Sequence, residues 1–127
     1  MIKHKVVTLI EMPAITKEGQ LDRYDLYSKF RLPPRAIGLL HAILLKEGYK
    51  NVTSIVPHLN NPQNKLTKAN LKRIKQSDYL LLSAITRTIV QTEQLARQYK
   101  KWNPKGRVIL GGPHATFLSE QCLKWAD

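Results

Sequence analysis

The chain has 127 residues, 43% of them hydrophobic and 7% aromatic, which is typical of a single globular domain. No run approaches the roughly 20 apolar residues of a membrane span, and no signal peptide is recognisable, so we expect a cytoplasmic protein without a membrane partner. Cys122 is the only cysteine, which excludes an internal disulfide, while the net charge of +12 leaves an acidic or nucleic-acid partner to be considered.

Strand-like and helix-like segments alternate along the chain. Short apolar runs predict strands at 6–10, 51–56, 79–84 and 107–110, and helical spacing predicts helices at 35–47, 67–76 and 89–101 and a last helix capped by Ser119. Such alternation gives a parallel sheet with right-handed crossovers and helices on both faces. We therefore expect an α/β, flavodoxin-like (Rossmann-like) three-layer sandwich with strand order 2-1-3-4.

The fourth predicted strand runs straight into the turn Gly111-Gly112-Pro113-His114. Two glycines at this point let another group approach the backbone closely. In an open α/β sheet, ligands bind beyond the carboxyl ends of the strands, where this turn is expected to lie. An ordinary strand-to-helix turn is the better explanation of a bare Gly-Gly pair, so the interpretation depends on the rest of the chain.

Two features of the predicted topology are unusual. The connection from Glu11 to Pro33 has roughly twenty residues against a usual ~2–6, and loops of this length commonly contact ligands. The chain also stops at Asp127, where a fifth strand would begin, so the fourth strand would present a bare edge. We expect residues 1–127 to form one domain, truncated at its C-terminal end or covered at this edge by self-association or a downstream domain.

Four segments carry a resemblance to a known family. They are Leu32-Pro33-Pro34 with Gly38-Leu39-Leu40, Asn51-Val52 to Ile55-Val56-Pro57, Asp78 to Ser83 followed by Thr86, and Gly111-Gly112-Pro113-His114-Ala115-Thr116. In this order and spacing they resemble the cobalamin-binding domain that precedes many radical S-adenosylmethionine enzymes. Trp125-Ala126-Asp127 is similar to the approach to that family's fifth strand, but the Gly-Glu-Gly-Glu run that normally follows is absent.

The resemblance implies that the domain holds a corrinoid, cobalamin, at the carboxyl ends of its strands. The slot for the nucleotide tail would be lined by Ser83, Ala84 and Thr86 and by Gly111, Gly112, Pro113 and His114. Hydroxyl groups would donate to the tail, glycines would leave room for its flat base, and Pro33 and Pro34 would face the corrin ring. The iron–sulfur cluster, S-adenosylmethionine and methyl transfer or related chemistry would belong to a downstream domain, so this chain alone is not expected to be catalytic.

The histidines do not suggest an imidazole ligand to cobalt from the usual loop. Domains of the methionine-synthase type carry Asp-x-His-x-x-Gly after the first strand, but here no histidine lies between His4 and His41. We expect His41 on the inner stripe of the first helix, His58 exposed at a strand end, and His114 in a structural hydrogen bond. No two histidines have the spacing of a metal site, and there is no C-x-x-x-C-x-x-C motif for an iron–sulfur cluster.

Other functions fit the residues less well. A phosphorelay receiver needs an aspartate at the end of the third strand, where this chain has Ser83-Ala84-Ile85, and residues 12–17 are a poor phosphate loop for a flavin binder. A basic interaction or nucleic-acid-binding module without a cofactor is supported by charge alone. Lys68, Lys72 and Lys75 share the outward face of one helix, with no interleaved aromatic residue of the kind that single-strand binders use, so nucleic acid is not the favoured partner.

Overall fold

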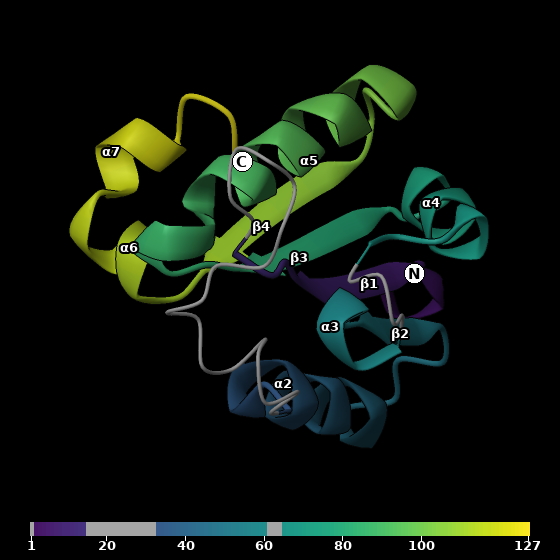
Figure 1. Ribbon diagram of the computed structural model, residues 1–127. Coiled ribbons are helices and arrows are strands. Elements are labelled where there is room, and N and C mark those ends of the chain that lie inside the picture. Colours follow the sequence, from purple (N-terminus) through teal and green to yellow (C-terminus); the bar gives the residue numbers. More distant parts are fainter. Residues whose placement is uncertain (1, 15–32, 61–64) are drawn as a thin grey trace.

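Four parallel strands form the sheet around which the chain folds (Figure 1). The structure is a computed structural model that describes residues 2–14, 33–60 and 65–127. The strands are β1 (Val7–Glu11), β2 (Val52–Ile55), β3 (Tyr79–Ser83) and β4 (Arg107–Gly111). They pair in parallel in the order β2-β1-β3-β4, which confirms the predicted fold class and strand order.

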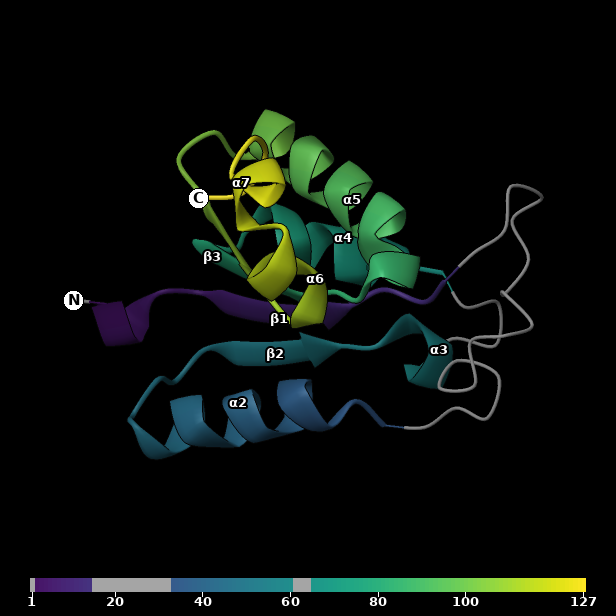
Figure 2. The same ribbon diagram turned by 90° about the vertical axis from the view of Figure 1, so that its left-hand side faces the viewer.

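Helices lie on both faces of this sheet (Figure 2). α2 (Arg35–Lys46) covers one face, and α4 (Lys68–Lys75) and α5 (Ile89–Trp102) cover the other. The shorter helices are η1 (Ile2–His4), α3 (Pro57–Asn60), η2 (Thr86–Thr88), α6 (Pro113–Phe117) and α7 (Ser119–Cys122). The last helix, α7, begins at Ser119 as predicted, but Leu118 and not Ser119 is its N-cap, and the short helix α6 before it was not predicted. Among the described residues, no helix is long and apolar enough to cross a bilayer.

Local signals in the sequence set the ends of the two predicted helices α2 and α4. Pro34 is the extended residue before α2. Gly48 follows the end of this helix with a φ of 89°, a backbone conformation that residues with a side chain rarely adopt. Thr67 begins α4 with a capping box: its hydroxyl accepts from the Asn70 N–H at 3.1 Å, and the Asn70 side chain accepts from the Thr67 N–H at 3.0 Å. These helices therefore start and stop close to their predicted bounds.

Alternating side chains of the strands build a core on each face of the sheet, and the two cores differ in size. On the α4 and α5 side, the buried cluster includes Ile10, Leu80, Val108, Ile74 and Tyr99. On the α2 side, the buried members are Leu9, Ile37 and Val56. The face covered by α4 and α5 thus has the larger hydrophobic core, and the face covered by α2 has the smaller one.

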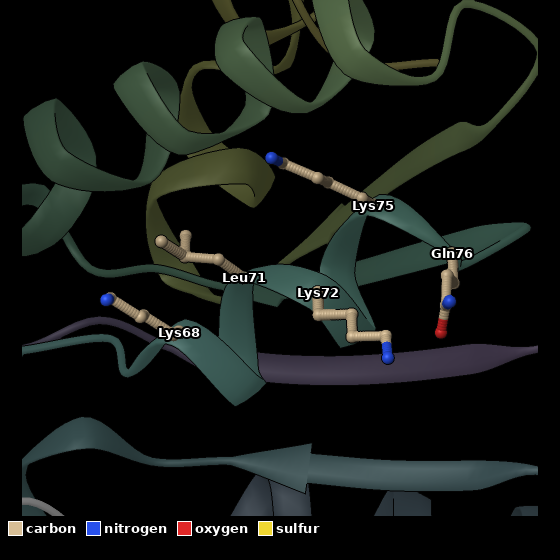
Figure 3. A pocket seen from close by; sticks show the side chains of 5 residues that line it. All are labelled: Lys68, Leu71, Lys72, Lys75 and Gln76. Carbon is tan, nitrogen blue, oxygen red and sulfur yellow. The ribbon is translucent and has the colours of Figure 1, made fainter.

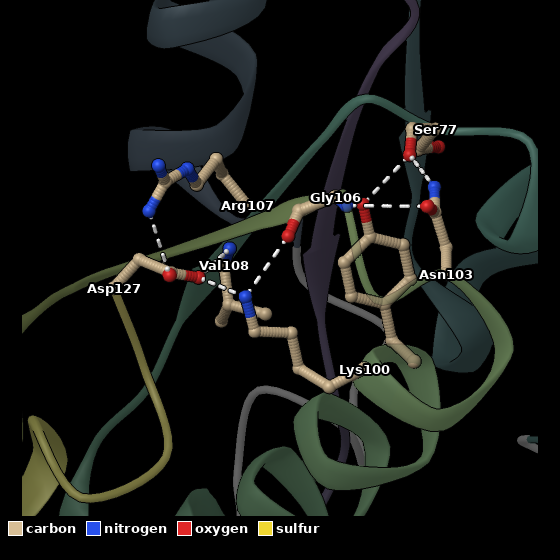
Figure 4. Close-up of polar contacts among 8 residues, drawn as sticks. Ser77, Lys100, Asn103, Gly106, Arg107, Val108 and Asp127 are labelled. Carbon is tan, nitrogen blue, oxygen red and sulfur yellow. Dashed lines mark hydrogen bonds and ion pairs between the residues drawn. The ribbon is translucent and has the colours of Figure 1, made fainter.

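Polar contacts fix the amino ends of the strands (Figure 4). The Ser77 carbonyl, just before β3, accepts hydrogen bonds from the Tyr99 hydroxyl at 2.6 Å and from the Asn103 amide at 2.8 Å. The Ser77 hydroxyl lies 2.6 Å from that of Thr8 in β1. Burial, with the charges of Asp78 and Asp127, raises the pKa of Tyr99 to about 12, so the phenol stays a proton donor. A Cβ on Gly106 would collide with this phenol, which explains why a residue without a side chain occupies position 106.

Asp127 occupies part of the outer edge of β4 (Figure 4). Its backbone N–H donates to the Val108 carbonyl at 2.9 Å, and its carboxylate accepts from the Val108 N–H at 2.8 Å. Lys100 and Arg107 also donate to this carboxylate, at 2.6 and 3.1 Å. The expectation of a wholly bare edge is therefore wrong at Val108. Leu110 is the next residue whose backbone groups face outward, because alternate residues of a parallel strand face the same neighbour.

The Gly106 contact predicts opposite effects for two glycine-to-alanine changes. Gly106→Ala should lower the free energy of unfolding by more than about 2 kcal/mol, since the new Cβ displaces Tyr99 from the core. Gly38→Ala, in α2, is the matched control, because a Cβ there meets no atom within 4 Å and alanine favours the helix by about 0.5–1 kcal/mol. Urea unfolding measures both. Equal stabilities for the two variants would contradict the packing described.

The Asp127 contacts predict a dependence of stability on pH. Burial of this carboxyl opposes ionisation, but hydrogen bonds from Lys100, Val108 and Arg107 outweigh it and hold its pKa below the ordinary 3.8. Its stabilising contribution is therefore complete above about pH 4 and is lost as the pH falls through the lower folded-state pKa. Asp127→Asn should lower the free energy of unfolding by about 1–2 kcal/mol at neutral pH and by much less at acid pH. Urea unfolding of both proteins between acid and neutral pH measures this difference. A loss of unfolding free energy that does not change with pH would show that the charge of Asp127 is unimportant.

Candidate functional site

The carboxyl ends of β1, β3 and β4 lie side by side. Glu11 pairs in register with Ser83, and Ser83 pairs with Gly111. The loops after these three strands therefore leave from one edge of the sheet, as the predicted topology required. This edge is where parallel α/β sheets bind ligands.

Gly112 packs against the backbone at the end of β3. Its φ is 99°, a conformation that side chains disfavour, and a Cβ there would lie 2.5 Å from the Ala84 carbonyl oxygen. The buried Ala84 in turn donates its N–H to the Gly111 carbonyl at 3.1 Å. Gly112 is thus required by the turn itself. The expectation that both glycines leave room for a ligand is wrong at Gly112, because the group that approaches it is the protein's own backbone.

Gly111, by contrast, borders open space. It is exposed, and a Cβ added to it would meet no atom within 4 Å outside its own neighbours in the chain. Its register partner Ser83 is half-buried and carries a hydroxyl that can donate or accept. Gly111 and Ser83 therefore form an accessible part of this edge.

A hydrogen bond connects the loop after β3 to α6. The Nδ1 atom of His114 lies 3.1 Å from the hydroxyl of Thr86, and His114 is buried. This confirms the structural hydrogen bond predicted for His114. When Nδ1 carries the proton, the Thr86 hydroxyl accepts from it and keeps its own proton for another acceptor. Pro113, as the first residue of α6, has no N–H to satisfy at that end.

Thr88, which is not among the predicted site residues, supports the same loop. Its side chain is buried, accepts from the Ile85 N–H at 3.2 Å and lies 3.2 Å from the Ile85 carbonyl oxygen. A threonine three residues after the end of a loop and just before a helix is the sequence pattern that could have predicted this role for Thr88. This contact fixes the path from Ala84 to Thr86.

Pro33 and Pro34 come from a separate part of the edge. They immediately precede α2, which packs on β1 and β2 rather than on β4. Pro33 is exposed and Pro34 is half-buried. The structure thus joins Ser83, Ala84, Thr86 and the glycine turn directly, whereas Pro33 and Pro34 precede a helix that packs on the β1 and β2 half of the sheet.

The histidines of the described residues have differing surroundings. His41 lies 2.6 Å from the Ser54 hydroxyl, which ties α2 to β2, while His4 is exposed in η1. The expectation that His58 is exposed is wrong: only 1% of it is accessible, because α3 folds it inward after β2. No group of three His, Cys, Asp or Glu side chains in the described part of the chain could hold a metal ion.

A second candidate surface lies on α4, away from the glycine turn (Figure 3). Lys68, Leu71, Lys72, Lys75 and Gln76 line a hollow of about 380 Å³ there. Lys75 extends over the Trp102 ring, with its nitrogen 4.8 Å from the centroid. The lining consists of flexible lysine chains around one leucine, which is suited to contact with an acidic surface and offers no fixed geometry for a small ligand.

Comparisons with known proteins assign the chain to a family. A sequence model of the B12 binding domain matches residues 26–127. The chain is also 30% identical over 98 residues to the anaerobic magnesium-protoporphyrin IX monomethyl ester cyclase of Rubrivivax gelatinosus; the match covers 75% of this chain and 18% of the cyclase. No solved structure gives a significant match.

The carboxyl edge offers open backbone and nearby hydroxyl groups. Gly111 leaves the backbone open where a Cβ would otherwise project, Ser83 is its register partner, and Thr86 is held by His114 in the loop that follows Ser83. The sheet order, the open edge and the match over residues 26–127 agree. The chain therefore belongs to the family of B12-binding domains, and its cofactor is cobalamin.

Proposed function

We propose that the chain holds cobalamin at the carboxyl ends of β3 and β4, in the space that borders Gly111. The observation that carries the proposal is the contrast between the two glycines: Gly112 is closed off by Ala84, whereas Gly111 faces open space beside Ser83. A flat base can approach the backbone only where no Cβ intervenes. The Gly112 turn keeps Gly111 in that position.

Each residue of the proposed site has a distinct role. Ser83 and Thr86 donate hydrogen bonds to the polar tail of the cofactor, and His114 orients the Thr86 hydroxyl through their 3.1 Å contact. Ala84 and Pro113 shape the walls, and Pro33 and Pro34 are placed to face the corrin ring from the start of α2. When bound, cobalamin supplies a cobalt centre that can carry an alkyl group. The side chains orient the cofactor and exclude water from one side of it.

We further propose that this domain is the N-terminal accessory part of a larger cytoplasmic enzyme of the radical S-adenosylmethionine type. The chain spans 18% of the length of the cyclase that it matches. Its one cysteine, Cys122, is buried, and burial, with the charge of Glu93, raises the pKa of its thiol and disfavours the thiolate. A cluster and the methyl transfer or related chemistry would therefore belong to a downstream domain, for which the outer edge of β4 at Leu110 is a point of attachment.

A basic interaction module is the second candidate function, and one observation favours it. Lys68, Lys72 and Lys75 line the α4 hollow without an acidic residue among them. An acidic protein surface or nucleic acid bound there would leave the carboxyl edge unaffected. Cofactor binding and salt-dependent anion binding can therefore be measured separately.

The first test of the proposed function is titration with hydroxocobalamin. We expect saturable changes in visible absorption, and a roughly fivefold weaker affinity in both Ser83→Ala and Thr86→Ala, the effect of one lost hydrogen bond. Lys72→Ala on α4 is the control and should bind as the unaltered chain does. Absence of binding, or an effect of Lys72→Ala alone, would favour the interaction module instead.

Paramagnetic resonance of the same complex, reduced to cob(II)alamin, tests the axial ligand. We expect the nitrogen splitting to be identical in protein grown with ordinary histidine and with histidine carrying the heavy nitrogen isotope. A triplet that becomes a doublet on labelling would identify a protein imidazole, and His58→Ala and His114→Ala would then show which histidine supplies it.

The glycine contrast predicts two separable variants. Gly111→Val should keep the melting temperature nearly unchanged, because its Cβ enters open space, and should weaken hydroxocobalamin binding by at least about tenfold through overpacking. Gly112→Ala should lower the melting temperature of the cofactor-free protein, because its Cβ meets Ala84 and its φ is 99°. Thermal melts and absorption titrations measure these effects. Unchanged affinity in Gly111→Val would place the cofactor elsewhere.

A further inference from the structure

A groove with positively charged walls runs between α5 and the segment that follows α7, two elements that lie side by side in Figure 2. One part of it is a hollow of about 500 Å³, lined by Arg97, Lys100, Lys101, Lys124, Trp125 and Ala126. A second hollow of about 340 Å³ shares Arg97, Lys124 and Trp125 with the first, so the two are continuous. We call them together the α5 groove. Unlike the hollow on α4, it has walls from two separate elements.

Two of the four cations that line the α5 groove have no acidic partner. Lys101 and Lys124 are exposed, and neither contacts a carboxylate within residues 2–14, 33–60 and 65–127. The other two cations are paired with acids, in the pairs Arg97–Glu93 at 2.8 Å and Lys100–Asp127 at 2.6 Å. The groove therefore keeps an excess of positive charge that an anionic partner would complement.

The lining of the groove suits carboxylates better than the bases of a nucleic acid. Arg97 binds Glu93 through its Nε atom, which leaves the terminal nitrogens of its guanidinium available, and this planar group matches a carboxylate. Proteins that bind single strands stack the bases on exposed aromatic rings. Trp125 is only 9% exposed, because it belongs to the hydrophobic core, so it offers no free ring face. The positive charge of the groove is thus not accompanied by a stacking platform.

The length of the groove matches a short extended peptide. Its lining on α5 extends from Ile89 to Lys101, and twelve residue steps of a helix cover about 18 Å. An extended chain advances by about 3.3 Å per residue, so roughly five residues span the same distance. Side chains of an extended chain alternate in direction, and acids at every second position therefore point the same way.

We propose that the α5 groove binds an extended acidic segment of a second protein, whose carboxylates pair with Lys101, Lys124 and the terminal nitrogens of Arg97. A second copy of this chain is not this partner, because its nine acidic residues include no two that are adjacent or that alternate. The contact does not depend on the proposed cofactor site. The groove approaches the carboxyl edge of the sheet at one end, where His114 contributes to its lining.

Fluorescence anisotropy in 0.1 M salt tests the proposal with a dye-labelled peptide of six residues in which aspartate and threonine alternate. We expect saturable binding and a dissociation constant at least roughly tenfold higher in the double variant Lys101→Glu/Lys124→Glu, because two attractive pairs become repulsive. The matched control is Lys68→Glu/Lys72→Glu on α4, which changes the net charge equally. It should raise the dissociation constant less than about twofold, because salt screens charges beyond about 10 Å. Circular dichroism verifies that both variants fold.

Nuclear magnetic resonance of the chain labelled with heavy nitrogen locates the bound peptide. The amide signals of Lys101, Lys124 and Ala126 should shift during the titration, and those of Lys68 and Lys72 should not. A peptide with asparagine in place of aspartate should leave all of them unchanged, because it lacks the charge that the groove complements.

Three results would overturn the proposal. Absence of binding by the aspartate peptide would mean that the groove does not hold an acidic segment. Equal weakening by the two double variants would show a general attraction between charges without a site on α5. A dye-labelled oligothymidylate of twelve nucleotides that binds more tightly than the peptide, and that Lys101→Glu/Lys124→Glu releases, would make nucleic acid the partner of the groove.

Discussion

The close approach of the Gly112 backbone to Ala84 is the contact on which the carboxyl edge depends. It joins the end of β4 to the end of β3, and it is possible only because Gly112 lacks a Cβ and adopts a positive φ. The next residue back, Gly111, is thereby held in the open, in register with Ser83. A side chain at Gly112 would push the two strand ends apart and move every group of the proposed cofactor site with them.

The opposite end of the sheet supplies the rigidity that this edge needs. Ser77 is bonded through its carbonyl to Tyr99 and Asn103 and lies within hydrogen-bond distance of Thr8, so β1, β3 and α5 are fixed together where the strands begin. Asp127 holds the first half of β4 in the same region. Because the amino ends are locked, the loops at the carboxyl ends can differ in sequence without loss of the fold, as is usual where binding residues are carried by loops on a rigid scaffold.

The fold could be predicted from the sequence because its signals are local and repeated. Apolar runs located all four strands, and their alternation with helices left few possible topologies. The roles within the glycine turn could not be predicted, because Gly111 and Gly112 are identical in sequence and differ only in what lies opposite each. His58 was misplaced for the same reason: its burial depends on how α3 folds back, which no neighbouring residue specifies. The part of the predicted site on residues 15–32, before Pro33, lies outside the described residues.

The side chains of the proposed site are suited to position a ligand and poorly suited to react with one. His114 is buried and engaged with Thr86, and Cys122 is buried with a thiol pKa that burial raises, so neither is poised as a base or a nucleophile. Among the described contacts, Ser83 meets no base, and the hydroxyl of Thr86 meets only the buried ring of His114. In the proposed site, reactivity would come from the cofactor, and the protein contributes its placement. In that proposed site, the positive φ of Gly112 and the contact between Thr86 and His114 both serve geometry, because an error in the position of the turn would displace a cofactor bound beside it.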